Sequence, residues 1–189
     1  MCVKDFMNHV HALECKLTEC EIIALRLYTL PAFKHINDPL RDLKRVKDEK
    51  RHPLALLTYH LAMALKKMRR IGAKGNSAIE SMVLWRGMKD LSVSEEYSSQ
   101  GGTELAPMST TDDLATAVQF CMSKRSLIFC IQTKNKLQRG VDMWWISAFP
   151  GESEILFPPL TYLQPTGRRQ IVEIDGMHFT IVEVSPTIA

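Results

Sequence analysis

Apolar residues in the first 72 positions recur at the spacing of an α-helix. The clearest case is the segment "PLALLTYHLAMALKKMRRIG", residues 53–72. Apolar positions three and four residues apart lie on one face of a helix. These positions are Leu54, Leu57, Leu61, Leu65 and Met68. We expect an amphipathic helix that ends near Gly72, because glycine is the preferred residue just after a helix.

Capping residues predict two more helices in this half. Thr18 followed by Glu21 forms a capping box, so a helix should cover "IIALRLYTL" and end before Pro31. Asp38 and Pro39 have the types of an N-cap and a first-turn proline. They predict that another helix begins there and covers "LRDLKRVKDEK".

After about residue 76 the pattern changes to short β-rich runs. They are "SMVLWRGM", "LIFCIQT", "EILFPP", "RQIVEI" and "HFTIVEV". The last two flank Asp175-Gly176, a dipeptide typical of a two-residue hairpin turn. One helix, "DDLATAVQFCM", interrupts the strands, and we expect it to begin at Thr111 or Asp112. Helices first and strands later predict an α+β protein.

Composition limits the class of protein without giving a function. Apolar residues make up 46% and charged residues 24% of the chain, as in ordinary soluble globular proteins. The net charge of +3 is too small to indicate a nucleic-acid partner. No apolar run approaches the roughly 18 to 20 residues that cross a bilayer, and the N-terminus shows no signal peptide. We therefore expect an intracellular protein without a membrane span.

The cysteines and histidines indicate neither a disulfide framework nor a metal centre. The five cysteines are odd in number and form no CxxC pair, and the six histidines show no ligand spacing. This pattern favours buried, reduced thiols in an intracellular protein. We expect no metal site.

Three polar features are associated with the predicted strands. Arg86 stands in the apolar run "VLWRG", hydroxyl side chains occupy residues 109–111, and Glu152 and Glu154 are one residue apart in "FPGESEILFPP". Residues i and i+2 of a strand point to the same face, so the two carboxylates should lie side by side, where each raises the cost of ionising the other. Each feature alone has a structural explanation: an edge-strand arginine, a helix cap and a solvated strand end.

Taken in order, the three features resemble the mono-ADP-ribosyltransferases of the arginine–serine–glutamate type. That family has an Arg on one strand, Ser-Thr-Ser on a second and Glu-x-Glu at the start of a third. The corresponding residues are Arg86-Gly87, Ser109-Thr110-Thr111 and Glu152-Ser153-Glu154, with a threonine at the third hydroxyl position. The segment "LTECEIIALRLYT", followed by "INDPLR", is similar to the family's helical "YT…IN..LR" segment. The resemblance covers about residues 17–184.

The resemblance implies both a fold and a reaction. The fold is an N-terminal helical segment packed on a mostly antiparallel β core, in which two sheets form a sandwich with an NAD cleft. We expect one catalytic domain over residues 1–189, with a helical subregion at about 1–76 and a β-rich core at about 77–189. The reaction transfers ADP-ribose from the co-substrate NAD to an arginine of a target protein and releases nicotinamide.

The resemblance also implies a catalytic role for four residues. Glu154 would bind the nicotinamide ribose and stabilise the positive charge that develops there in the transition state. Glu152, the family's signature for an arginine acceptor, would hold the incoming guanidinium and take its proton. Ser109 would hydrogen-bond Glu154, and Arg86 would pair with an NAD phosphate through its planar fork.

Further contacts to NAD are implied for several residues. Gly87 would let the backbone approach the nicotinamide amide. Phe120 matches the family phenylalanine that stacks on nicotinamide, although it also has the spacing of a core residue of its own helix. Additional NAD contacts are implied for Thr110, Asn37 and Arg41, and for Lys124 or Arg125 at the phosphates.

Contacts to the target protein are expected just before the two glutamates. Trp144, Trp145 and Phe149 lie next to the family's target-recognition loop, and Glu152 belongs to it. An NAD glycohydrolase, in which water is the acceptor, would use the same Arg86, Ser109 and Glu154. A catalytically silent NAD-binding or interaction module is the alternative from another class. The family includes toxins and effectors, so delivery into another cell stays open.

Overall fold

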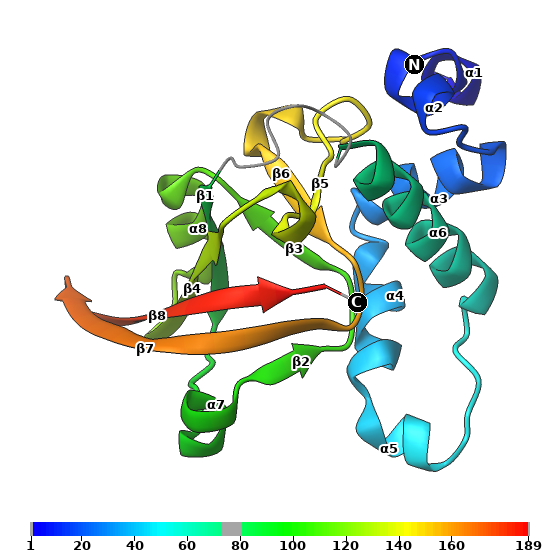
Figure 1. The fold of residues 1–189 in the computed structure, drawn as a ribbon. Coiled ribbons are helices and arrows are strands. Elements are labelled where there is room, and N and C mark those ends of the chain that lie inside the picture. Colours follow the sequence, from blue (N-terminus) through cyan, green and yellow to red (C-terminus); the bar gives the residue numbers. More distant parts are fainter. Residues whose placement is uncertain (1, 73–80, 189) are drawn as a thin grey trace.

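The computed structural model describes residues 2–72 and 81–188. Helices come first along the chain and a sheet follows (Figure 1). The N-terminal helices are α1 (Val3–Met7), α2 (Val10–Glu14), α3 (Glu19–Tyr28), α4 (Phe33–Arg41), α5 (Leu43–Lys47) and α6 (Ala55–Gly72). The strands are β1 (Met82–Lys89), β2 (Gly102–Glu104), β3 (Met108–Thr111), β4 (Arg125–Thr133), β5 (Val141–Asp142), β6 (Glu154–Phe157), β7 (Thr161–Ile174) and β8 (Met177–Thr187). Between the strands lie α7 (Glu95–Gln100), α8 (Leu114–Cys121), and the 3-10 helices η1 (Lys136–Gln138) and η2 (Pro150–Glu152).

The predicted helices around residues 18–31 and 53–72 are confirmed. Helix α3 opens with the expected capping box, in which the Thr18 hydroxyl accepts from the Glu21 N–H and the Glu21 carboxylate accepts from the Thr18 N–H. The helix ends at Tyr28, three residues before Pro31. Helix α6 ends at Gly72, as expected. The predicted boundary between residues 76 and 77 lies outside the described residues.

The predicted helix start at Asp38-Pro39 is wrong. Helix α4 already runs from Phe33 to Arg41, so Pro39 lies inside it, in its final turn. A proline there removes a single backbone hydrogen bond of a short helix. Burial of Ile36 and Asn37 favours this earlier helix, because packing contributes more than capping preference to the stability of short helices.

The strands form a sheet in the order β2-β7-β8-β4-β1-β3-β6-β5. Neighbouring strands are antiparallel except β4 and β8, which are parallel. The α+β class and the mostly antiparallel core are therefore confirmed. The expected two sheets are instead hydrogen bonded into one, although β1 and β3 are joined only through the pair Trp85 and Thr111.

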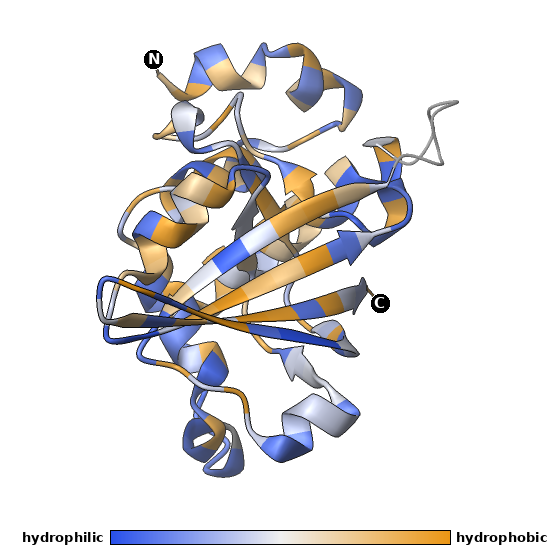
Figure 2. Ribbon diagram, turned by 90° about the vertical axis from the view of Figure 1, so that its left-hand side faces the viewer, coloured by the Kyte–Doolittle hydropathy of each residue, from blue (hydrophilic) through white to orange (hydrophobic). Residues whose placement is uncertain are grey.

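The hydrophobic core joins the N-terminal helices to one end of the sheet. Ile22 and Leu65 are fully buried in it together with Met143, Ile146 and Leu156, which come from the region of β5 and β6. A second cluster packs the strands themselves, which are mostly apolar in the middle of the sheet (Figure 2). The helical half and the β-rich half therefore share one core.

The β7–β8 hairpin has the predicted turn. Asp175 and Gly176 have φ angles of 50° and 73°, the positive values that a two-residue hairpin turn of the primed type requires. The hairpin extends away from the helical layer (Figure 1). In the part of the chain that the structure describes, every helix is too short or too polar to cross a bilayer.

Candidate functional site

A cleft of about 500 Å³ lies where helices α3, α4 and α8 meet strands β1, β3 and β6. Most of the residues expected to bind NAD, to catalyse the reaction or to contact the target line this cleft. They are Asn37, Arg41, Arg86, Gly87, Ser109, Thr110, Phe120, Phe149, Glu152 and Glu154. Residues that are as far apart as Asn37 and Glu154 in the sequence are thus brought to one place by the fold.

Glu154 is held by Ser109 across two paired strands. In the antiparallel register of β3 and β6, Thr111 lies opposite Glu154 and Ser109 lies opposite Leu156. The Ser109 hydroxyl donates a hydrogen bond of 2.5 Å to Oε1 of Glu154. Burial raises the pKa of Glu154, and the charge of Glu152 raises it further, whereas the bond from Ser109 lowers it. The site therefore places a desolvated carboxylate of fixed orientation in the cleft.

Glu152 does not share a strand with Glu154, so the expected side-by-side arrangement on one strand face is wrong. Glu152 ends the 3-10 helix η2, and Ser153 has a left-handed conformation with φ of 47° before β6 begins at Glu154. The Thr111 hydroxyl donates to the Glu152 carbonyl at 2.9 Å and holds this turn. Both carboxylates still line the cleft, because the turn redirects the chain between them.

Thr111 does not open the following helix. Helix α8 is capped by Asp113, whose carboxylate accepts from the N–H groups of Ala115 and Thr116. The predicted cap at Thr111 or Asp112 is therefore wrong by one or two residues. Thr111 belongs to strand β3, and its hydroxyl bonds to the Glu152 turn and accepts from the Asp113 N–H.

Arg86 is an interior residue of the sheet. Strand β1 lies between β4 and β3, which excludes the edge-strand explanation for this arginine. Its Nη1 donates to the carbonyl of Ser109 at 2.8 Å. Burial lowers the pKa of Arg86, and the nearby Glu104 carboxylate opposes that effect. A guanidinium nevertheless stays protonated in proteins, so Arg86 brings a positive charge into the cleft.

Gly87 is required by close packing of helix α8 on strand β1. A Cβ atom at this position would lie 2.0 Å from the Ala117 carbonyl oxygen and 2.9 Å from the Cys121 Cβ. Any side chain would push α8 away from the strand. Helix α8 also carries Phe120, which lines the same cleft as Arg86.

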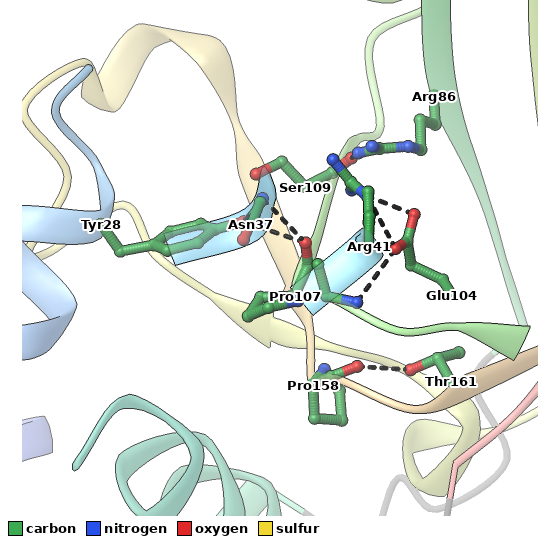
Figure 3. A network of polar contacts seen from close by, with 10 residues as sticks. Tyr28, Asn37, Arg41, Arg86, Glu104, Pro107, Ser109, Pro158 and Thr161 are labelled. Carbon is green, nitrogen blue, oxygen red and sulfur yellow. Dashed lines mark hydrogen bonds and ion pairs between the residues drawn. The ribbon is translucent and has the colours of Figure 1, made fainter. Parts of the chain in front are cut away.

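Arg41, at the end of α4, forms a two-point ion pair with Glu104, at the end of β2. Its Nε and Nη2 donate to the two carboxylate oxygens at 2.9 and 3.0 Å (Figure 3). Glu104 Oε1 also accepts from the Ala106 N–H at 3.0 Å. Arg41 is thereby fixed at the cleft, close enough to Arg86 for its charge to lower the Arg86 pKa.

Asn37 and Tyr28 anchor the residues that lead into β3. The Tyr28 hydroxyl donates to the Pro107 carbonyl at 3.0 Å, and Asn37 Nδ2 donates to the Tyr28 oxygen at 3.1 Å and to the Pro107 carbonyl at 3.3 Å (Figure 3). Burial raises the pKa of Tyr28. Asn37 is 4% exposed, and within the described residues its Oδ1 has no hydrogen-bond partner. Asn37 lines the cleft, but that oxygen is itself buried.

The aromatic residues expected near the site separate into two groups. Phe120 and Phe149 line the cleft and are 54% and 51% exposed, so Phe120 is not a core residue of its helix. Trp144 is exposed but does not line the cleft. Trp145, expected among the target contacts, is instead 5% exposed and stacks on His9, because its segment packs under the N-terminal helices.

Lys124 and Arg125 lie away from the cleft. Both are exposed, at the start of β4, and neither lines the cleft. The sequence placed them near the NAD phosphates, and the structure does not bring them there. Within the described ranges, no group of three or more His, Cys, Asp or Glu side chains is arranged to hold a metal ion.

Comparison with solved structures identifies the architecture. Over 99% of this chain and 82% of the other, it superposes on the ADP-ribosyltransferase Vis of Vibrio splendidus with a TM-score of 0.66 and 18% identity. The superposition on the ADP-ribosyltransferase toxin Plx2a of Paenibacillus larvae has a TM-score of 0.66 and 19% identity, over 98% of this chain and 95% of the toxin chain. The superposition on the ADP-ribosyltransferase HopU1 of Pseudomonas syringae pv. Tomato has a TM-score of 0.65 and 16% identity, over 96% of this chain and 85% of HopU1. The chain has the ADP-ribosyltransferase fold.

No protein-family model matches the sequence, and the comparison with curated proteins finds no match. Within the ADP-ribosyltransferase fold, sequence reasoning missed the contributions of Tyr28 and Glu104. Tyr28 stands in the "LYT" segment that carried part of the resemblance, but nothing local indicates that its hydroxyl reaches Pro107. Glu104 lies in a polar stretch before β3, and its partner Arg41 is 63 residues away. No local pattern could have found that pair.

Proposed function

We propose that the protein transfers ADP-ribose from NAD to an arginine side chain of a target protein. The observation that carries the proposal is the cleft that contains Glu154, held by Ser109, together with Glu152 and Arg86. A carboxylate that is desolvated and fixed in orientation suits a reaction in which positive charge develops beside it. A second carboxylate at the same cleft suits an acceptor that is itself a cation.

Glu154 would act on the ribose. As the bond between nicotinamide and ribose breaks, the electron pair leaves with nicotinamide and positive charge develops on the sugar. Glu154 would stabilise this charge more strongly in the transition state than in the ground state, because the charge on the sugar develops only as the bond breaks. The Ser109 bond keeps the carboxylate in place, so little reorganisation is needed during the reaction.

Glu152 would act on the acceptor. A guanidinium is a poor nucleophile while it keeps all its protons. Glu152 would hold the arginine through charge-assisted hydrogen bonds and take one proton as a guanidino nitrogen bonds to the ribose carbon. Glu152 reaches the cleft from the η2 turn, whereas Glu154 reaches it from strand β6. The carboxylate proposed for the acceptor arginine and the one proposed for the ribose are therefore held by different elements.

The residues of the cleft fit the parts of NAD. Arg86 and Arg41 supply positive charge for the two phosphates, and Asn37 supports the wall of the cleft through its bonds to Tyr28 and the Pro107 carbonyl. Phe120 exposes a ring on which nicotinamide can stack. Thr110 is buried, and its hydroxyl donates to the Ile155 carbonyl, so it supports the Glu154 strand rather than the ligand.

Exposed aromatic residues support a target-binding surface beside the cleft. Phe149 lies at the cleft just before η2, and the exposed Trp144 lies five residues earlier. Together with Glu152 they would receive the target protein. We also propose that residues 1–189 act as one catalytic domain, since helices of the N-terminal half and strands of the C-terminal half both line the cleft.

Two of the similar structures carry ligands that fit this proposal. Vis has been solved with agmatine, a small guanidinium compound, and exoenzyme S of Pseudomonas aeruginosa with carba-NAD. All five cysteines are free thiols, although Cys2 and Cys20 are exposed rather than buried as expected. Free thiols suit action inside a cell where NAD is present. The protein would act there whether it is made in that cell or delivered to it.

A nicotinamide-release assay with and without agmatine tests the proposal. We expect nicotinamide release from NAD and formation of ADP-ribosyl-agmatine. Nicotinamide release without any agmatine product would indicate an NAD glycohydrolase. Binding of NAD without nicotinamide release would indicate a catalytically silent module, and either result would contradict the proposed function.

A further inference from the structure

Glu104, which is not among the proposed catalytic residues, links helix α4 to the chain that leads into β3. Its carboxylate accepts two hydrogen bonds from Arg41 and one from the Ala106 backbone (Figure 3). The Ala106 bond fixes the carboxylate relative to the chain that leads into β3. Arg41 in turn lines the cleft, whereas Glu104 does not. The Glu104 carboxylate therefore does not reach the cleft itself, and it can influence a ligand there only by holding Arg41.

Glu104 binds one edge of the Arg41 guanidinium, so the other edge is available to a ligand. A guanidinium has five N–H groups in a planar fork. Glu104 takes the side formed by Nε and Nη2, and within residues 2–72 and 81–188 the Nη1 group forms no hydrogen bond. One arginine can thus pair with a carboxylate along one edge and with a phosphate along the edge that remains.

Glu104 also offsets repulsion between two cations. The charge of Arg41 lowers the pKa of Arg86, and the charge of Glu104 raises it. Without the carboxylate, the long and partly exposed Arg41 side chain would rotate away from Arg86 into solvent, where its charge is better hydrated. A phosphate that needs both guanidinium groups would then find only one in place.

We propose that Glu104 is a positioning residue that holds Arg41 beside Arg86 so that its remaining edge binds a phosphate of NAD. This inference rests on the proposed function. Glu104 touches neither NAD nor the acceptor and acts through Arg41. Its removal should therefore change how tightly NAD binds and leave the rate from the saturated complex nearly unchanged.

The test is Glu104→Gln, with NAD binding measured by calorimetry and nicotinamide release measured at saturating NAD. Glutamine keeps the shape of the side chain, but its NH₂ group faces the N–H groups of Arg41 and cannot accept from them. We expect the Kd for NAD to rise about tenfold, the effect of losing one good charge-assisted bond, and kcat to stay within about twofold. Glu96→Gln, an exposed change of the same charge on nearby α7, should leave both values unchanged.

A double-mutant cycle with Arg41→Ala separates positioning from a general structural effect. In the Arg41→Ala background, Glu104→Gln should change the Kd by less than about twofold, because the group that it positions is gone. Equal weakening in both backgrounds, an unchanged Kd in the single variant, or tighter NAD binding would each overturn the role of Glu104. Failure of the wild-type protein to bind NAD would instead contradict the proposed function itself.

Discussion

The Ser109 hydroxyl lies 2.5 Å from Oε1 of Glu154 and ties strand β3 to the first residue of strand β6. This contact fixes the rotamer of a carboxylate that the surrounding protein has largely removed from water. Burial and Glu152 raise the pKa of Glu154, and Ser109 lowers it. The protein thus keeps a carboxylate in a place where its charge is costly, which is typical of functional sites.

Activity should depend on pH through Glu154. In the proposed reaction the ionised form is the active one. Because burial raises the pKa of Glu154, nicotinamide release should fall on the acid side at a higher pH than an ordinary glutamate would give. Ser109→Ala removes the bond that lowers this pKa, so the acid limb of kcat/KM should move to still higher pH. The check is a pH profile of both proteins, and an acid limb that stays in place in the Ser109 variant would contradict the link.

Arg86→Lys should weaken NAD binding. Lysine keeps the charge but lacks the planar fork, and the loss of a charge-assisted hydrogen bond predicts a Kd about tenfold to hundredfold higher. Calorimetry with NAD measures this value. Arg125→Lys is the matched control, because Arg125 is exposed and outside the cleft. Equal effects of the two substitutions would show that Arg86 does not contact the ligand.

Gly87→Ala should destabilise the fold and reduce activity. The added Cβ would lie 2.0 Å from a backbone oxygen of α8, so strand and helix must separate. Overpacking of this kind costs about 1 to 3 kcal/mol of unfolding free energy. Gly72→Ala is the control, since a Cβ there meets no atom of residues 2–72 and 81–188 within 4 Å. Chemical denaturation compares the two variants, and a stability of Gly87→Ala equal to wild type would be inconsistent with this packing.

Local chemistry explains which parts of the fold could be predicted from the sequence. The capping box at Thr18 and Glu21 and the turn at Asp175-Gly176 each depend on side chains a few residues apart. Pro39 misled the prediction because packing of α4 outweighs the preference of proline for the first turn.

In the site, too, local patterns could be predicted from the sequence, whereas contacts between distant segments could not. The ordered motifs predicted Arg86, Ser109 and Glu154, and the fold brings these three residues to one cleft. The alternation rule placed Glu152 on the strand, whereas it ends a 3-10 turn. That turn depends on the Thr111 hydroxyl, 41 residues away in the sequence. The Tyr28–Pro107 contact likewise joins distant segments, so only the folded chain reveals it.

Glu152→Gln should separate transfer from hydrolysis. Loss of the proton acceptor predicts a fall of about hundredfold or more in ADP-ribosyl-agmatine formation, whereas Glu154 would still support NAD cleavage with water. Because the charge of Glu152 raises the pKa of Glu154, the acid limb of NAD hydrolysis should also move to lower pH. Both products are measured in one preparation, with the fold checked by circular dichroism. Parallel loss of the two activities would mean that the carboxylates act as one coupled unit.

The most direct test of the central claim is nicotinamide release by Glu154→Gln. The amide keeps the size of the side chain and removes the charge that would face the ribose in the proposed reaction, so we expect release to fall by about hundredfold to thousandfold. The raised pKa of Glu154 means that the folded state binds the carboxyl proton more tightly than the unfolded state does. The protonated group therefore contributes to the free energy of unfolding at low pH, and this contribution is lost as pH rises through the raised pKa. The uncharged variant should therefore unfold at neutral pH at a temperature no lower than wild type. A folded variant that releases nicotinamide at nearly the wild-type rate would contradict the account.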